Sequence, residues 1–355
     1  MKSKPKIIRF TLLLSMLTLC FSSSAEDQVW DIKSRMVPAP AGASEKIRQS
    51  IASTPLPDPA AARNMFTDEK TINWGEMIKA TSSSRDASAL KLATSLGVSI
   101  KKHKIEGITI YHVDPAKVDP RFSNSMFLYV HGGAYVFGGG DGSVSEAAVI
   151  ASTSKIRVIS VDYRMPPKDP FPSAVDDVVV VYKHLLDEKK AAKSIAIGGT
   201  SAGGGLALAA VHKFKALGLQ LPGAIYAGTP WADLTKTGDT LFTNEGLDRV
   251  LVTYDGLLGA AARLYADGHD MQDPFISPVY GNFSGFPPTY LVTGTRDMFL
   301  SDTARTHRKL RAAGVVADLN VYEGLSHAGY AFNLTSPESI QVYSEMRDFL
   351  LAQLN

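Results

Sequence analysis

The feature that most constrains this chain is the pentapeptide Gly199-Thr200-Ser201-Ala202-Gly203. The apolar run 194–198 before it is typical of a strand, and 206–210 after it is typical of a helix, so Ser201 falls at the apex of a tight strand–turn–helix connection. This is the setting of a nucleophile elbow, where small neighbours let the strand and helix approach and a strained backbone exposes the serine hydroxyl. A glycine-rich turn with a serine helix cap would have the same sequence pattern. Other motifs are therefore needed to distinguish it from a nucleophile elbow.

A second motif, His131-Gly132-Gly133, directly follows the apolar strand-like run 126–130. A strand that ends in this tripeptide is typical of the oxyanion hole of lipases and esterases, because the glycines let backbone N–H groups turn into the site. Removing one such donor typically costs about 2.7–4 kcal/mol of transition-state stabilisation. We expect the donors to be the N–H groups of Gly132, Gly133 and Ala202, the last at a helix N-terminus. Two motifs in this order argue against a simple glycine-rich turn.

The C-terminal part of the chain offers the other two groups that a serine hydrolase needs, in the order serine, acid, histidine. Asp297 and His327 each follow a strand-like run, so both lie past the carboxyl end of a strand, where open α/β sheets place their sites. Asp302 and His307 are competitors, but they fall in a segment with the pattern of a capped helix. We therefore expect Ser201 to attack an ester, His327 to act as general base and Asp297 to orient the imidazole.

Together with Asp162-Tyr163-Arg164, these motifs resemble those of the hormone-sensitive-lipase-like family of α/β-hydrolases. More narrowly, the chain looks like the bacterial family IV esterases whose elbow reads Gly-Thr-Ser-Ala-Gly, and the resemblance runs from about residue 105 to the C-terminus. It implies a serine esterase without a cofactor, acting on short-to-medium acyl esters. The family often has a third glycine where this chain has Ala134, and we expect the oxyanion hole to survive that difference. Asp162, Tyr163 and Arg164 are expected to brace the loops around the elbow.

The apolar runs predict seven core strands with helical segments between most of them. This alternation indicates an α/β protein with a doubly wound, mainly parallel sheet. Combined with the resemblance, it predicts the α/β-hydrolase fold, in which helices flank the central sheet and a helical cap covers the site. The expected strands are 108–113, 126–130, 158–161, 194–198, 224–227, 290–293 and 319–322.

The expected organisation has three parts: a signal peptide at 1–25, an N-terminal segment at 26–104 and a catalytic domain at 105–355. The N-terminal segment is rich in proline in its first half and has a helical pattern over 82–96. The resemblance implies that this segment forms the cap together with an insertion at about 233–271. Leucines recur in that insertion at roughly helical spacing.

The N-terminus has the pattern of a secretory signal peptide. Basic residues precede the apolar run 10–21, and Ser23, Ser24 and Ala25 provide a small-residue cleavage site. The run is too short for a comfortable bilayer span, so no stable membrane insertion is expected after cleavage. These features predict a secreted or periplasmic protein. Cys20, the only cysteine, would carry the lipid of a lipoprotein, but Leu19 before it is not the small residue that this modification requires.

Composition and motifs argue against nucleic-acid-binding, metal-binding and nucleotide-binding proteins. The formal net charge of +2 gives no electrostatic case for nucleic-acid binding. The histidines are scattered without paired ligand spacing, so no metal site is expected. The glycine-rich run 138–142 has neither the lysine of a phosphate-binding loop nor dinucleotide-binding spacing.

Three functions remain, with a small-molecule ester as the expected partner of the first. A carboxylesterase is favoured by the ordered triad. A lactone or carbamate hydrolase could use the same residues, because the tetrahedral intermediate is alike. A non-catalytic binding protein would normally lack a member of the triad, and all three residues are present in this sequence.

Overall fold

A computed structural model describes residues 36–66 and 71–354. The chain divides into a short unit, Met1–Pro38, and a large unit, Ala39–Asn355, which holds the elements described below. The expected signal peptide and Cys20 lie outside the described residues. Within the described ranges, no helix is both long enough and apolar enough to cross a membrane.

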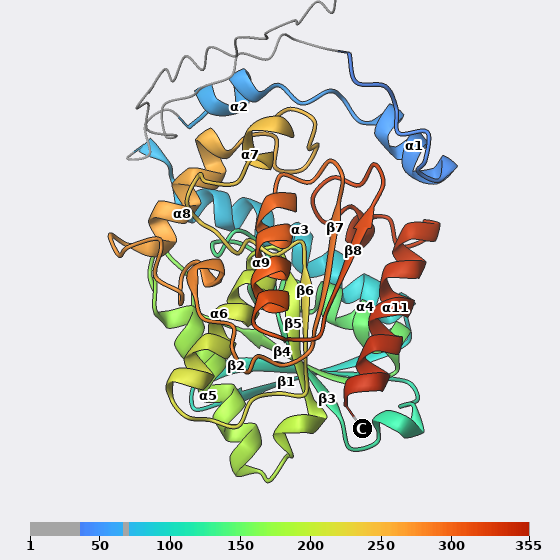
Figure 1. Cartoon of the computed structure of the whole chain (residues 1–355), viewed down its shortest axis with the longest axis vertical. Helices are drawn as coiled ribbons and strands as arrows, with labels where there is room; N and C mark the ends of the chain where they lie inside the picture. Colours follow the sequence, from blue (N-terminus) through green and yellow to red (C-terminus); the bar gives the residue numbers. More distant parts are fainter. Residues whose placement is uncertain (1–35, 67–70, 355) are drawn as a thin grey trace, which may run out of the picture. The chain divides into compact units, whose positions relative to one another are not determined.

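The large unit is built on an eight-stranded sheet with the strand order β1-β2-β4-β3-β5-β6-β7-β8 (Figure 1). Strands β3 to β8 run parallel to one another, whereas β2 is antiparallel to both of its neighbours, β1 and β4. The predicted mainly parallel sheet of the α/β-hydrolase fold is confirmed. The strands are β1 (Val98–Ile105), β2 (Ile108–Pro115), β3 (Met126–Val130), β4 (Arg157–Asp162), β5 (Ile195–Thr200), β6 (Ala224–Gly228), β7 (Thr289–Gly294) and β8 (Ala317–Tyr322).

The central strands are apolar throughout because both of their faces are buried. In β3, Leu128 and Val130 point into one apolar core, while Phe127 and Tyr129 point into the core on the opposite face. This alternation follows from the two-residue period of a strand. It explains why these strands could be read from the sequence as continuous apolar runs.

Strand β1 was not among the expected strands. It lies at the edge of the sheet, and its middle residues, including Lys101, Lys102 and Lys104, are exposed. It pairs with β2 from Val98 to Ile105. The sheet therefore begins at Val98, ahead of the boundary expected at residue 105.

Helices cover both faces of the sheet (Figure 1). Helices α5, α6 and α9 pack in one core, and α4 and α11 pack in the other, with α3 against α4. The helix expected over 82–96 is the C-terminal part of α3, which begins two turns earlier. The helices are α1 (Glu45–Ser53), α2 (Pro59–Asn64), α3 (Trp74–Ser95), α4 (Ser145–Ser154), α5 (Ser173–Asp187), α6 (Ala202–Ala216), α7 (Thr240–Thr243), α8 (Gly259–Ala266), α9 (Leu300–Ala312), α10 (Gly329–Phe332) and α11 (Pro337–Gln353).

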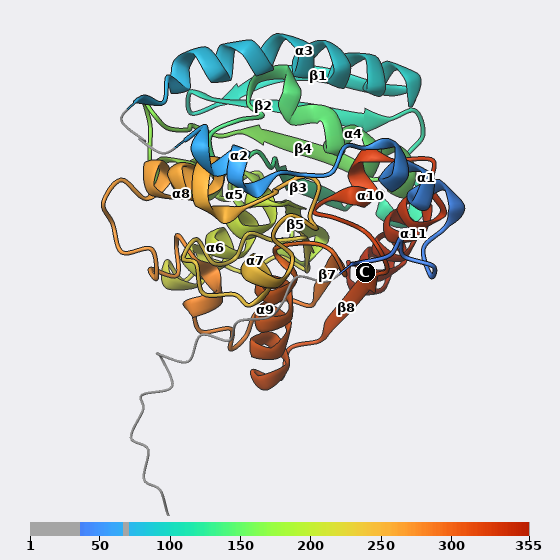
Figure 2. The same ribbon diagram turned by 90° about the horizontal axis from the view of Figure 1, so that it is seen from above.

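The segment after β6 contains two of these helices, α7 and α8, joined through an irregular helical turn at Tyr254–Leu258. Helix α2 of the N-terminal segment packs on this turn, and Figure 2 shows α2 beside α8. The two parts of the chain that were expected to form a cap are therefore in contact with each other.

Candidate active site

Ser201 lies between β5 and α6 with the backbone angles φ 64° and ψ −127°. A positive φ is strained for a residue with a side chain. Three backbone hydrogen bonds hold this conformation. The Ser201 N–H donates to the carbonyl of Gly228 at 2.8 Å, and the Ser201 carbonyl accepts from the N–H groups of Trp231 at 2.9 Å and Gly205 at 3.1 Å. Ser201 therefore has the strand–turn–helix setting that the pentapeptide predicts.

The glycines on either side of the elbow are required by close packing. A Cβ atom at Gly199 or Gly203 would lie 2.0 Å or 2.1 Å from the carbonyl oxygen of Val130 in β3. Only a residue without a side chain lets β5 and α6 approach the neighbouring strand this closely. The pattern Gly-x-Ser-x-Gly is thus a steric requirement of the turn.

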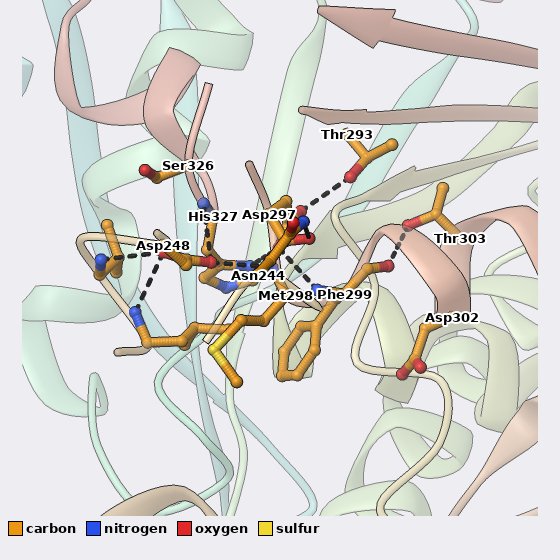
Figure 3. A network of polar contacts seen from close by, with 12 residues as sticks. Asn244, Asp248, Thr293, Asp297, Met298, Phe299, Asp302, Thr303, Ser326 and His327 are labelled. Atoms are coloured by element: carbon orange, nitrogen blue, oxygen red, sulfur yellow. Dashed lines mark hydrogen bonds and ion pairs between the residues drawn. The ribbon is translucent and has the colours of Figure 1, made fainter. Parts of the chain in front are cut away.

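His327 and Asp297 come together in the structure, as Figure 3 shows. The imidazole Nδ1 lies 3.1 Å from Asp297 Oδ1, and both side chains are buried. Thr293 Oγ1 donates to Asp297 Oδ2 at 2.8 Å, and the Phe299 N–H donates to Asp297 Oδ1 at 2.8 Å. When Nδ1 donates to the carboxylate, Nε2 is the nitrogen that can accept a proton.

The environment of His327 favours its charged form. Burial alone would lower the pKa of the imidazole, but the charge of Asp297, the hydrogen bond to Asp297 and the charge of Asp248 together raise the pKa above its ordinary value. An imidazolium that forms during a reaction is therefore stabilised here. The pair has the electrostatics of a general base with its orienting carboxylate.

Ser201, His327, Gly132 and Gly133 all line one cavity of about 620 Å³. Residues from the N-terminal segment and from the segment after β6 line the same cavity, so both of these segments contribute to the wall over the site. Those residues are Ala62, Phe66, Arg85, Ser88 and Leu92 from the N-terminal segment, and Val250, Leu251, Val252, Thr253, Leu257 and Leu258 from the segment after β6.

The expected oxyanion loop lies against Ser201. A Cβ atom on Gly132 would sit 2.6 Å from the carbonyl oxygen of Thr200 and 3.3 Å from Ser201 Cβ, so a side chain there would push the two segments apart. Ala202, the third expected donor, is the first residue of α6. Ala134 adopts a φ of 54°, a backbone conformation that favours glycine over residues with a side chain.

Two of the three residues expected to brace the loops around the elbow do so. The ring of Tyr163 stacks on His131 with a centroid distance of 4.1 Å, and its hydroxyl donates to the His131 carbonyl at 2.7 Å. Asp162 accepts the N–H of Gly140 at 2.9 Å. Arg164 instead forms an ion pair with Asp177 on α5.

The competitors Asp302 and His307 lie on α9, away from this cavity lining. Asp302 is buried and accepts the backbone N–H groups of Ala232 at 3.1 Å and Asp233 at 2.9 Å. These contacts give Asp302 a structural role beneath the segment that follows β6.

Sequence reasoning missed a buried carboxylate beside the elbow. Glu146 of α4 lines the cavity and accepts hydrogen bonds from four side-chain hydroxyls. One donor is Thr200, the residue before Ser201. Burial raises the pKa of this carboxyl. The donors are Thr200 at 2.7 Å, Tyr226 at 3.0 Å and Tyr343 at 3.2 Å to Oε1, and Tyr129 at 3.0 Å to Oε2.

Comparison with known proteins agrees with this fold. Residues 127–331 match the family model described as alpha/beta hydrolase fold. An acetyl-hydrolase of Streptomyces hygroscopicus is 30% identical over 226 residues, which cover 64% of this chain and 74% of that protein. An esterase of Acinetobacter venetianus is 30% identical over 227 residues, which cover 64% of this chain and 75% of that protein.

Solved structures extend the similarity to nearly the whole chain. The crystal structure of esterase E25 has a TM-score of 0.88 and 47% sequence identity, with 92% of this chain and 99% of that chain covered. An esterase from the bacterial hormone-sensitive lipase family has a TM-score of 0.69 and 30% sequence identity, with 76% of this chain and 92% of that chain covered.

The fold, the site and these relatives define a carboxylic ester hydrolase of the α/β-hydrolase superfamily. Within that superfamily, the chain belongs to the hormone-sensitive-lipase-like family, among the family IV esterases.

Proposed function

We propose that this carboxylesterase works through an acyl-enzyme on Ser201. The observation that carries the proposal is that Ser201, on its strained elbow, lines the same cavity as His327, whose Nδ1 contacts Asp297 at 3.1 Å. In the first step, the serine Oγ bonds to the ester carbonyl carbon while its proton passes to Nε2 of His327. The ester C–O bond then breaks, and the alcohol leaves with the proton from the imidazolium.

In the second step, water attacks the acyl carbon and gives a proton to His327. The bond to Ser201 Oγ breaks, the carboxylic acid leaves and the serine recovers its proton. In both tetrahedral intermediates, the N–H groups of Gly132, Gly133 and Ala202 are the proposed donors to the oxyanion. Preorganised backbone donors of this kind supply much of the rate enhancement in acyl transfer.

The proposed substrates are short-to-medium acyl esters. A cavity of about 620 Å³ suits a small ester, and its wall is largely apolar. Two relatives point the same way: one is named an acetyl-hydrolase, and the crystals of EstE5, with 28% identity to this chain, were soaked with p-nitrophenyl butyrate.

A series of p-nitrophenyl esters from acetate to palmitate tests this proposal. We expect kcat/KM to be highest among the short and medium chains and to fall by at least about tenfold for palmitate, because a long chain does not fit the cavity. An activity that keeps rising beyond decanoate would contradict the proposal. A lactone with the same number of carbons serves as comparison, and a preference for the lactone would identify a lactonase instead.

We also propose that the enzyme is exported and works outside the cytoplasm. The support is the order of basic residues, apolar run and small-residue site within 1–25. Sequencing the N-terminus of the native protein should give a start at Glu26. A lipidated start at Cys20 would indicate a lipoprotein, and a retained Met1 in the cytosol would refute export.

A further inference from the structure

Asp248, in the segment between α7 and the turn Tyr254–Leu258, is fully buried and accepts four backbone N–H groups (Figure 3). Its Oδ1 accepts from Val250 at 2.9 Å and Leu251 at 3.2 Å. Its Oδ2 accepts from Met298 at 2.9 Å and His327 at 3.3 Å. The two oxygens thus have different tasks: Oδ1 closes a local turn, and Oδ2 holds distant parts of the chain.

The two distant donors belong to the two loops that carry the acid and the base. Met298 directly follows Asp297, and the other donor is the N–H of His327 itself. Because a single oxygen accepts both, it fixes the backbone of the acid loop relative to the backbone of the histidine loop. A hydrogen bond to a charged acceptor is stronger than a neutral one, and burial increases the effect.

Neighbouring residues of the same segment hold the same two loops. The side-chain amide of Asn244 donates to the Asp297 carbonyl at 2.8 Å and to the Thr295 carbonyl at 3.3 Å. The N–H of Arg249 donates to Ser326 Oγ at 3.2 Å, next to His327. We call residues 244–249 the clasp segment.

The clasp segment is continuous with the wall of the cavity. Val250, Leu251, Val252 and Thr253 line the cavity directly after it, whereas Asp248 itself is not among the lining residues. Asp248 therefore does not need to touch a substrate to influence the reaction. It acts through the position of His327 and Asp297.

We infer that Asp248 is a positioning residue of the active site, which ties the cavity wall to the acid and histidine loops and holds His327 and Asp297 in register. The inference rests on the proposed triad. A displacement of about 1 Å in a reacting group can cost roughly a hundredfold in rate, so a residue that sets loop positions has a large effect on kcat.

Asp248→Asn separates the two tasks of the side chain. The amide oxygen can still accept the N–H groups of Val250 and Leu251, but the amide nitrogen replaces Oδ2 and meets two N–H donors. We expect kcat to fall about 10–100-fold, while KM changes by less than about threefold. The acid limb of the kcat/KM profile should move to lower pH, because the charge of Asp248 contributes to the raised pKa of His327.

Asp255→Asn is the matched control. Asp255 lies on the neighbouring turn, and its carboxylate pairs with Lys236 at 2.6 Å. This variant loosens the wall without touching the contacts of Met298 and His327, so we expect a change in kcat of less than about twofold. An equal loss of kcat in both variants, or an unchanged kcat and acid limb in Asp248→Asn, would overturn the inference.

Labelling with a fluorophosphonate separates this inference from the proposed triad. If Ser201 of the wild-type enzyme is not labelled, the triad fails; if it is labelled and Asp248→Asn keeps its kcat, only the positioning role fails. Each kcat is calculated from the concentration of labelled sites, so that unfolded protein is not included in the enzyme concentration. If Asp248→Asn does not fold, Asn244→Ala decides: a lower kcat at unchanged KM supports the clasp segment, and an unchanged kcat refutes it.

Discussion

Replacing Ser201 by alanine is expected to lower kcat for p-nitrophenyl acetate by roughly four to six orders of magnitude. The alanine removes the only atom of this side chain that can bond to the acyl carbon, so the acyl-enzyme cannot form. Binding of the ester should change little, because the cavity wall and the proposed oxyanion donors remain. The measurement is kcat and KM of the purified variant, with its circular dichroism spectrum as evidence of folding.

A fluorophosphonate probe tests the reactivity of Ser201 independently of turnover. The wild-type protein should take up about one label per chain, on the peptide that contains Ser201, and the variant should take up none. A folded Ser201→Ala variant with full turnover would exclude the proposed mechanism. A wild-type chain that stays unlabelled would instead favour a non-catalytic binding protein.

Glu146→Ala is expected to reduce the free energy of unfolding by about 3–5 kcal/mol. Four hydroxyls donate to this carboxylate, and the truncated side chain would leave buried donors without an acceptor. Since Thr200 is one of them, the backbone before Ser201 should also lose support. Chemical denaturation followed by tryptophan fluorescence measures the loss, and a change below about 1 kcal/mol would contradict this account.

Glu146→Gln is the conservative comparison, because the amide keeps the volume and one acceptor oxygen. Burial raises the pKa of Glu146 in the folded protein, so the folded state binds its proton more tightly than the unfolded state does. This contribution to stability is present below the unfolded pKa and is lost as the pH rises through the folded pKa. The penalty of the glutamine should therefore be larger in acid than at pH 8.

Most of the strands that the sequence predicted are central strands buried on both faces, although the edge strand β8 was predicted as well. Strands β3 and β5, for example, are unbroken apolar runs, and their observed limits lie within two residues of the expected ones. Strand β1 did not stand out because an edge strand needs few apolar residues, and its lysines face solvent. Its assignment depends on pairing with β2, which no local pattern reveals.

The residues of the candidate site also fall into two groups: those that a local sequence pattern predicts and those that only the fold reveals. Ser201, Asp297 and His327 could be proposed because each lies within five residues after the end of a strand, which is a local feature of the chain. Glu146 and Asp248 could not. Glu146 meets Thr200 and Tyr343 across 54 and 197 residues of sequence, and Asp248 meets His327 across 79. Only the folded chain brings such partners together. A single carboxylate in an apolar segment can indicate a buried polar contact, but it does not identify the partner.

The adjacency of the clasp segment and the cavity wall limits how this enzyme can be re-engineered for new substrates. Mutagenesis libraries aimed at a wider acyl range would naturally include 250–253, because these residues line the cavity. The N–H groups of Val250 and Leu251 anchor Asp248, however, so bulky or proline substitutions there would disturb the acid and histidine loops as well. Leu257 and Leu258 line the same cavity one turn further on. Neither donates to Asp248, so substitutions there should cost less turnover than substitutions at Val250 and Leu251.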